Sequence, residues 1–188
     1  GPQRGAPGRN GLSVDAMERL IAELKRLYLP RGAVAPDALA RHLLGQESLP
    51  VRLAADDGHV RALALPFERR KGDGEDGHWE RLCAVANALQ SGLDLPAPAV
   101  SITGEAGYRL WLSFGVPVPR DEAQRFVTGL AAAYAPDAGL ESVDLAAPVA
   151  LPPCLHPRTG LWAAFIHPGM GGSFTGDAGL ELPPPLAG

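Results

Sequence analysis

The chain has 188 residues, 46% of them hydrophobic, and a formal net charge of −4. This size allows one domain with a substantial core, and the acidic balance excludes a protein that coats nucleic acid by bulk charge. Cys83 and Cys154 occur without a CxxC or Cys/His cluster, which argues against structural zinc and favours a reduced, cytoplasmic setting. The sequence has no apolar run of about 18 residues and no signal-peptide pattern, so we expect no membrane or secretory segment.

Two helices are predicted in the first quarter of the chain. Residues 1–12 are rich in Gly, Pro and Arg and are expected to form a flexible lead-in. The spacing of Asp15 and Glu18 resembles a capping box, and apolar residues at helical spacing then continue to Pro30. A second short helix is predicted over 36–45, with proline at its start and glycine at its end.

The pattern then changes to strands. Residues 51–53 and 60–65 flank Asp56-Asp57-Gly58, which predicts a β-hairpin. A charged, glycine-bearing loop is expected at 69–77. An amphipathic helix should follow from Trp79 to about Gly92.

The segment 101–114, SITGEAGYRLWLSF, places glycine-containing turn residues between a β-rich run and an alternating strand. Successive side chains of a strand point to opposite faces of its sheet. One face should therefore carry Tyr108, Leu110, Leu112 and Phe114, and the other Arg109, Trp111 and Ser113.

This hairpin also has the composition of a phosphate cradle. Small hydroxyls, backbone N–H groups of a glycine turn and one cation are the groups that bind phosphate oxygens. The predicted nucleotide- or phosphate-binding residues here are Ser101, Thr103, Gly104, Gly107 and Arg109.

The last third is predicted to add a helix over 121–134, after Pro-Val-Pro at 117–119, with Phe126, Leu130 and Tyr134 inward. Ordered structure is expected to end with 149–166, and the proline-rich remainder, 168–188, is expected to be a tail or linker. The order of elements predicts an α+β fold over 13–167, with a mostly antiparallel sheet flanked by helices.

Three segments carry motifs in a recognisable order. Residues 42–68 contain a helix end, a hairpin and a strand ending in Pro66-Phe67-Glu68. Residues 101–119 hold the glycine turn followed by Tyr-Arg-Leu-Trp and Pro-Val-Pro, and residues 151–162 read LPPCLHPRTGLW. Together the three segments resemble the archaeo-eukaryotic primase (primase-polymerase) superfamily, most closely its small bacterial and mobile-element members. The resemblance covers about 36–167 and implies an RRM-like primase-polymerase core.

The resemblance also implies a catalytic site from which this sequence departs. In the family, strand-end carboxylates hold two divalent metal ions for nucleotidyl transfer, because hard cations need oxygen ligands. Here the first acid position is Pro66 and the second is Glu68; Asp144 is the candidate third acid, expected on a strand before Leu151. Glu68 and Asp144 are thus the candidate catalytic and metal-binding residues, with Mg²⁺ or Mn²⁺ as the cofactor if the domain is active.

The resemblance implies that basic side chains of this chain contact the nucleotide or the template. Arg109 stands where the family has a phosphate-contacting histidine, and arginine keeps a permanent charge for that role. His156 and Arg158 lie in the third motif, whose His-Pro-Arg-Thr-Gly run is most simply a hairpin turn. Trp79 and Trp162 are expected to be packing residues rather than base-stacking platforms.

Three functional interpretations remain open, and the first is favoured because of Pro66. The domain is a degenerate primase-like module that binds nucleoside triphosphate, single-stranded DNA or RNA, or a replication, repair or defence protein. Alternatively, it is an active primase-polymerase with an atypical metal site, or a purely structural interaction domain. A Ser-His-Asp hydrolase, a Rossmann enzyme and a P-loop enzyme are excluded for want of their motifs.

Overall fold

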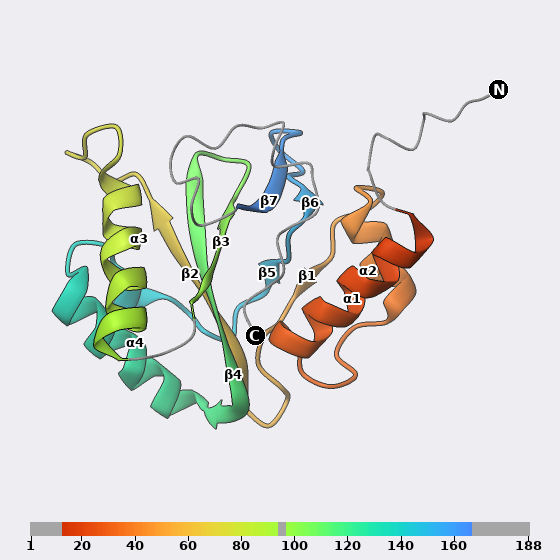
Figure 1. The fold of residues 1–188 in the computed structure, drawn as a ribbon, viewed down its shortest axis with the longest axis horizontal. Helices are drawn as coiled ribbons and strands as arrows, with labels where there is room; N and C mark the ends of the chain where they lie inside the picture. Colours follow the sequence, from red (N-terminus) through yellow and green to blue (C-terminus); the bar gives the residue numbers. More distant parts are fainter. Residues whose placement is uncertain (1–12, 94–96, 167–188) are drawn as a thin grey trace.

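The computed structural model describes residues 13–93 and 97–166 (Figure 1). The predicted lead-in of 1–12 and the tail of 168–188 lie outside the described residues. The helices are α1 (Val14–Tyr28), α2 (Pro36–Leu43), α3 (Gly77–Asn87) with a π-helical extension (Ala88–Gly92), α4 (Arg120–Tyr134) and a 3-10 turn (Leu140–Ser142). The strands are β1 (Pro50–Val51), β2 (His59–Glu68), β3 (Ala99–Ile102), β4 (Gly107–Pro119), β5 (Val149–Ala150), β6 (Cys154–Leu155) and β7 (Trp162–Ile166).

An antiparallel sheet forms the centre of the molecule. Five strands pair in the order β2-β4-β3-β7-β6, and β1 pairs separately with β5. Helices α3 and α4 lie on one side of the sheet, whereas α1 and α2 lie on the other (Figure 1). The predicted α+β class, with an antiparallel sheet flanked by helices, is confirmed. No helix within the described ranges is long and apolar enough to cross a membrane.

The alternation predicted for β4 is confirmed, and both faces of the strand are buried at residues 110–112. Tyr108, Leu110 and Leu112 pack in the core beneath α3 and α4, whereas Trp111 packs in a second core beneath α1 and α2. The indole of Trp111 lies 5.2 Å, centroid to centroid, from the ring of Tyr28 on α1. Because helices cover both faces there, three successive residues, 110–112, are apolar instead of alternating with polar ones.

The start of α1 differs from the prediction. Ser13, rather than the Asp15–Glu18 pair, caps the helix, because its hydroxyl accepts a hydrogen bond from the backbone N–H of Ala16 at 3.1 Å. Asp15 instead lies in the first turn, where a negative charge favours the helix dipole. The predicted end before Pro30 is confirmed, as are α2 and its glycine terminus, since Gly45 has φ +81°.

The first hairpin is only partly as predicted. Its turn forms around Gly58, which has φ +86°, but the adjoining ladder consists of one bridge between Ala54 and Val60. Strand β1 pairs instead with β5, with Val51 opposite Val149. The buried side chain of Val51 belongs to the core beneath α1 and α2, so burial in that core takes this segment away from β2.

The third and fourth helices form where predicted, with one error in orientation. The buried face of α4 includes Ala123, Val127 and Leu130, whereas Tyr134 is 43% exposed. Tyr134 lies in the last turn, and its hydroxyl reaches the end of the α3 extension, 3.6 Å from where a Cβ on Gly92 would lie. The aromatic ring therefore covers the end of the helix pair instead of entering the core.

Candidate functional site

The turn between β3 and β4 is closed by Thr103. Its backbone N–H donates to the carbonyl of Gly107 at 3.0 Å, and its hydroxyl donates to the same carbonyl at 3.3 Å. That hydroxyl also accepts from the backbone N–H of Glu105 at 3.2 Å. Gly104 and Ala106 both have positive φ, +81° and +65°. The turn is therefore tight, and it projects the side chain of Glu105 outward.

A second turn, between β6 and β7, is organised by His156. The backbone N–H of His156 donates to the carbonyl of Leu161 at 2.8 Å, and Gly160 N–H donates to the carbonyl of His156 at 2.9 Å. The ring Nδ1 accepts from the backbone N–H groups of Arg158 (3.1 Å) and Thr159 (3.3 Å). The hairpin turn predicted for the third motif is confirmed.

The two turns contact each other directly. The hydroxyl of Thr159 donates to the carbonyl of Gly104 at 2.9 Å. The carboxylate of Glu105 bonds to Nε2 of His156 at 3.0 Å and to the guanidinium of Arg158. This pairing, with Arg158 as the main cause, lowers the pKa of Glu105. The fold thus brings the second and third sequence motifs together at one end of the sheet.

The predicted hydroxyl ligands are directed toward the protein itself. Ser101 is buried, and its Oγ accepts from the indole N–H of Trp111 at 2.9 Å. Thr103 is also buried and closes the glycine turn. A phosphate contact by either hydroxyl stays a prediction.

Arg109 lies in a row of residues that crosses the sheet. It is opposite Pro66 on β2 and opposite Ser101 on β3, and Ser101 is in turn opposite Phe165 on β7. Arg109 and Pro66 line a cavity of about 240 Å³ together with Asp144. Burial lowers the pKa of Arg109 from its usual value. The cavity therefore contains one partly desolvated cation.

The two candidate acids lie in different surroundings. Glu68 is exposed at the end of β2, opposite Gly107. Asp144 does not lie on a strand, contrary to the prediction, because the chain between α4 and β5 forms the 3-10 turn and an irregular loop. Its carboxylate accepts from the guanidinium of Arg120 at 3.0 Å and from the backbone N–H of Ala146 at 2.9 Å.

These residues do not fit a two-metal site. Two divalent ions require several carboxylate oxygens converging on one position. Pro66 provides no ligand, and Asp144 is paired with Arg120. Within the described ranges, no group of three or more His, Cys, Asp or Glu side chains could hold a metal ion.

Glu105 is the site residue that the sequence did not identify. It lies between Gly104 and Gly107, and its partner His156 lies 51 residues further along the chain. An acidic residue inside a predicted phosphate-binding turn was the available signal. It could not reveal the partners, because contact between two distant turns depends on the packing of the sheet.

His42 has a structural role that its position in the sequence did not indicate. It is 1% exposed, and its Nδ1 accepts from the backbone N–H of Leu49 at 2.9 Å. The other ring nitrogen therefore carries the proton and donates to the carbonyl of Leu151 at 2.8 Å. This bridge ties α2 to the segment that leads into the second turn.

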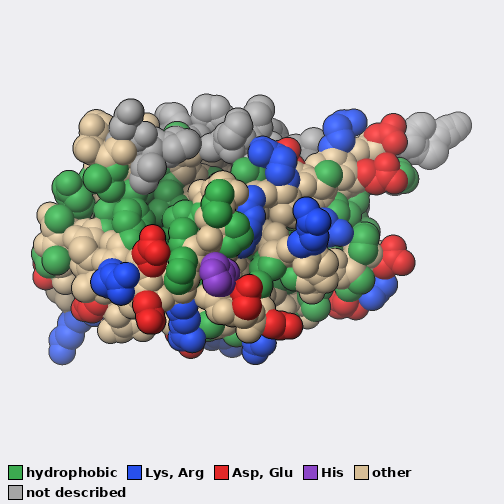
Figure 2. Space-filling view, turned by 90° about the horizontal axis from the view of Figure 1, so that it is seen from below, with side chains coloured by type: hydrophobic (Ala, Val, Ile, Leu, Met, Phe, Trp, Pro, Cys, Tyr) green, Lys and Arg blue, Asp and Glu red, His purple; other side chains and the backbone are tan. Residues whose placement is uncertain are grey.

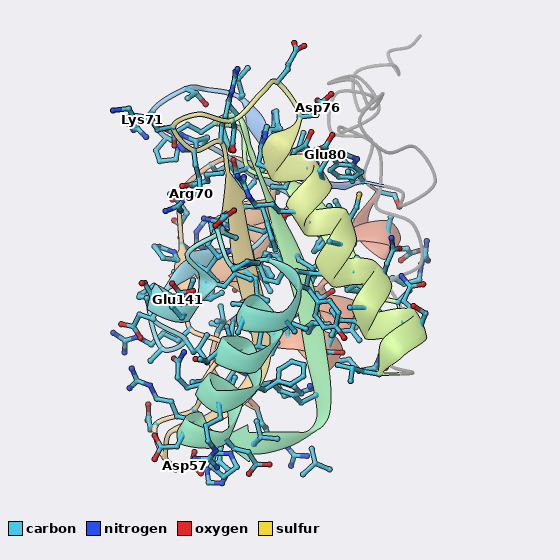
Figure 3. All side chains as sticks on the ribbon, turned by 90° about the vertical axis from the view of Figure 1, so that its left-hand side faces the viewer. Asp57, Arg70, Lys71, Asp76, Glu80 and Glu141 are labelled. Atoms are coloured by element: carbon cyan, nitrogen blue, oxygen red, sulfur yellow. The ribbon has the colours of Figure 1, made fainter. Side chains whose placement is uncertain are left out.

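A larger cavity, of about 930 Å³, lies between the end of α1 and the start of β2. Figure 2 looks toward this end and shows apolar, basic and acidic side chains around a histidine. Asp57, one of its lining residues, lies at the opposite end of the molecule from Arg70 and Lys71, which follow β2 (Figure 3). None of the predicted site residues lines it. The basic lining residues are Lys25, Arg26, Arg31 and Arg61.

Comparisons with known proteins identify the fold. No family model and no curated protein matches the sequence. The structure is similar to the polymerase domain of Mycobacterium tuberculosis Ligase D in complex with DNA, with a TM-score of 0.53 and 16% identity over 65% of this chain. That match covers 51% of the polymerase domain, so this chain spans about half its length. A second similar structure, with a TM-score of 0.48 and 16% identity, is the AEP domain of the cyanophage S-2L primase-polymerase, matched over 93% of this chain and 100% of that one.

The predicted fold is therefore confirmed, by the likeness to the Ligase D polymerase domain together with the α+β architecture. At 16% sequence identity, this likeness shows a shared fold and does not show a shared activity.

Proposed function

We propose that this domain binds a phosphate-bearing ligand, a nucleoside triphosphate or a single-stranded nucleic acid, without strong nucleotidyl transfer. The process that we propose it serves is DNA replication, DNA repair, or a mobile-element or defence process. The observation that carries the proposal is the contact between the two turns, which puts His156 and Arg158 beside the glycine turn.

The chemistry of these groups suits phosphate. An imidazole N–H and an arginine fork both donate to phosphate oxygens, and arginine can do so through two parallel hydrogen bonds. Arg158 is exposed and Arg109 is partly exposed, so both can reach a ligand. The similar domain of Mycobacterium tuberculosis Ligase D was solved with DNA, which supports a nucleic-acid ligand for this fold.

Weak catalysis is proposed from Pro66. Nucleotidyl transfer by two metal ions depends on carboxylates that clamp the attacking and leaving oxygens. Pro66 occupies one of the positions that the family resemblance assigns to such a carboxylate. Asp144 is paired with Arg120, so its carboxylate is already neutralised in part.

A second candidate function is an active primase-polymerase that uses Mg²⁺ or Mn²⁺ with Glu68 and Asp144. One observation favours it: Asp144 and Arg109 line the same cavity. This arrangement would place an acid near a cation that could hold a triphosphate.

Binding and extension assays separate these functions. The protein is titrated with a deoxynucleoside triphosphate and with labelled single-stranded DNA and RNA, at low and high salt, because phosphate contacts weaken with ionic strength. We expect binding that Arg158→Ala and Arg109→Ala both weaken, with no template-dependent extension in Mg²⁺ or Mn²⁺. Extension abolished by Glu68→Ala would establish the second function. If no probe binds at low salt, the third interpretation, a structural interaction domain, is the one that remains.

A further inference from the structure

The two donors proposed to bind phosphate are already bound to a carboxylate of this chain. One oxygen of Glu105 bonds to Nε2 of His156 at 3.0 Å, and its other oxygen bonds to the Nη2 group of Arg158. Glu105 therefore satisfies both donors at once. A ligand anion that accepts from both Nε2 of His156 and this Nη2 group must take the place of the carboxylate.

The geometry of the ring shows that this contact is directional. Because Nδ1 of His156 accepts from two backbone N–H groups, the neutral ring carries its proton on Nε2. That proton points at Glu105, so the imidazole presents a donor to the anion without needing a positive charge. The turn thus fixes a hydrogen-bond donor in place before any ligand arrives.

The carboxylate is held weakly enough to be displaced. The side chains of Glu105 and Arg158 are 44% and 71% exposed, whereas that of His156 is 18% exposed. Ion pairs between exposed side chains each stabilise a protein by only about 0–1 kcal/mol. The terminal phosphate of a triphosphate carries more charge than a carboxylate and has more acceptor oxygens, and an oligonucleotide presents several phosphates in a row, so either ligand can compete for the same donors.

The backbone of the turn that carries Glu105 is fixed in position. Gly104 and Ala106 on either side both have positive φ, and Thr159 holds the carbonyl of Gly104 at 2.9 Å. A Cβ on Gly104 would lie 3.2 Å from the Cβ of His156, so the turns are in close contact. The backbone therefore keeps the carboxylate at the donors unless its side chain rotates away.

We propose that Glu105 is an internal competitor that occupies the phosphate-binding position formed by His156 and Arg158, and that it sets the affinity of this position for phosphate ligands. This inference rests on the proposed function. The bound carboxylate then limits which ligands bind. A ligand that contacts only these two donors gains little binding free energy, because it must first displace Glu105. A ligand that also contacts Arg109 or other groups gains enough to displace it.

The proposal is tested by removing the negative charge of Glu105 while keeping the shape of its side chain. Glu105→Gln keeps the size of the side chain but removes the anion, and we expect it to tighten binding of a deoxynucleoside triphosphate or of a short labelled oligothymidylate by roughly threefold to thirtyfold. The probe whose affinity changes identifies the source of the phosphate. Glu18→Gln, at an exposed position of α1, changes the net charge equally and should leave affinity nearly unchanged.

A second variant tests whether the tighter binding depends on Arg158. In the Glu105→Gln background, Arg158→Ala should remove the gain, and circular dichroism checks that each variant is folded. If the wild-type protein binds a probe and the Glu105→Gln variant binds it equally well, the proposal that Glu105 competes with the ligand is wrong, whereas the proposed function stands. If neither protein binds any probe at low salt, both proposals are wrong.

Discussion

Pro66 lies directly opposite Arg109 in the antiparallel register of β2 and β4. Both residues line the same cavity of about 240 Å³. β2 is an edge strand of the five-stranded sheet, where a proline is tolerated because it need not donate to a second neighbour. The position that the family resemblance assigns to a metal-binding acid is therefore filled without disturbing the sheet, and the facing cation has no carboxylate from this position.

Restoring an acid at Pro66 should weaken anion binding. Cross-strand partners of opposite charge interact by about 0.2–1 kcal/mol, so Pro66→Asp should lower the affinity for a triphosphate by a factor of up to about five. Pro66→Asn is the neutral control of the same shape. Equal affinities of these two variants, measured by titration at fixed salt, would show that Arg109 does not contribute to anion binding.

Gly104 should tolerate substitution worse than Gly160. Both have positive φ, +81° and +73°, so Gly→Ala at either position should cost about 1–2 kcal/mol of backbone strain. At Gly104 the new Cβ would also lie 3.1 Å from the carbonyl oxygen of Leu161, whereas nothing lies within 4 Å at Gly160. Urea unfolding should show Gly104→Ala to be the less stable variant by about 1 kcal/mol or more. Equal stability would mean that the contact between the turns relaxes freely.

The Trp111–Ser101 hydrogen bond should contribute to stability as a pair. Ser101→Ala leaves a buried indole N–H without its partner, which costs about 1–3 kcal/mol. In a double-mutant cycle with Trp111→Phe, the double variant should lose less than the sum of the two single variants. Denaturant unfolding of the four proteins measures the coupling, and strict additivity would contradict it.

The stability of the domain should fall as the pH is lowered through the titration of His42. Burial is the main cause that lowers the pKa of His42 from the usual 6.5 in the folded protein. The unfolded chain then binds the proton more readily, so this contribution is complete above about pH 6.5 and is lost as the pH falls toward and through the folded-state pKa. His42→Gln, which cannot titrate, should show a flatter dependence of the unfolding free energy between pH 7.5 and roughly pH 5. An unchanged slope would exclude His42 as the titrating group.

Local patterns predicted the elements well. The capping residue of α1 was a local error, and the other failures arose where a distant partner decided the outcome. The alternation of β4 was readable because a strand has a period of two residues, and the end of α1 before Pro30 was readable because proline ends helices. The pairing of β1 with β5 was not readable, since two residues of strand have no pattern of their own. For the same reason, the sequence did not show that Ser101 is buried and accepts a hydrogen bond from Trp111.

The sequence by itself determined the order of the elements, the glycine turns and the absence of an acid at position 66, because each follows from residue identity and short-range spacing. It also predicted the cations proposed to bind phosphate, Arg109, His156 and Arg158. Only the tertiary structure decided that the carboxylate of Glu105 meets His156 and Arg158, and that Asp144 pairs with Arg120. The physical reason is that hydrogen bonds between side chains depend on distances of a few ångströms, and for residues far apart in the chain those distances are set by how helices and strands pack, not by local preference.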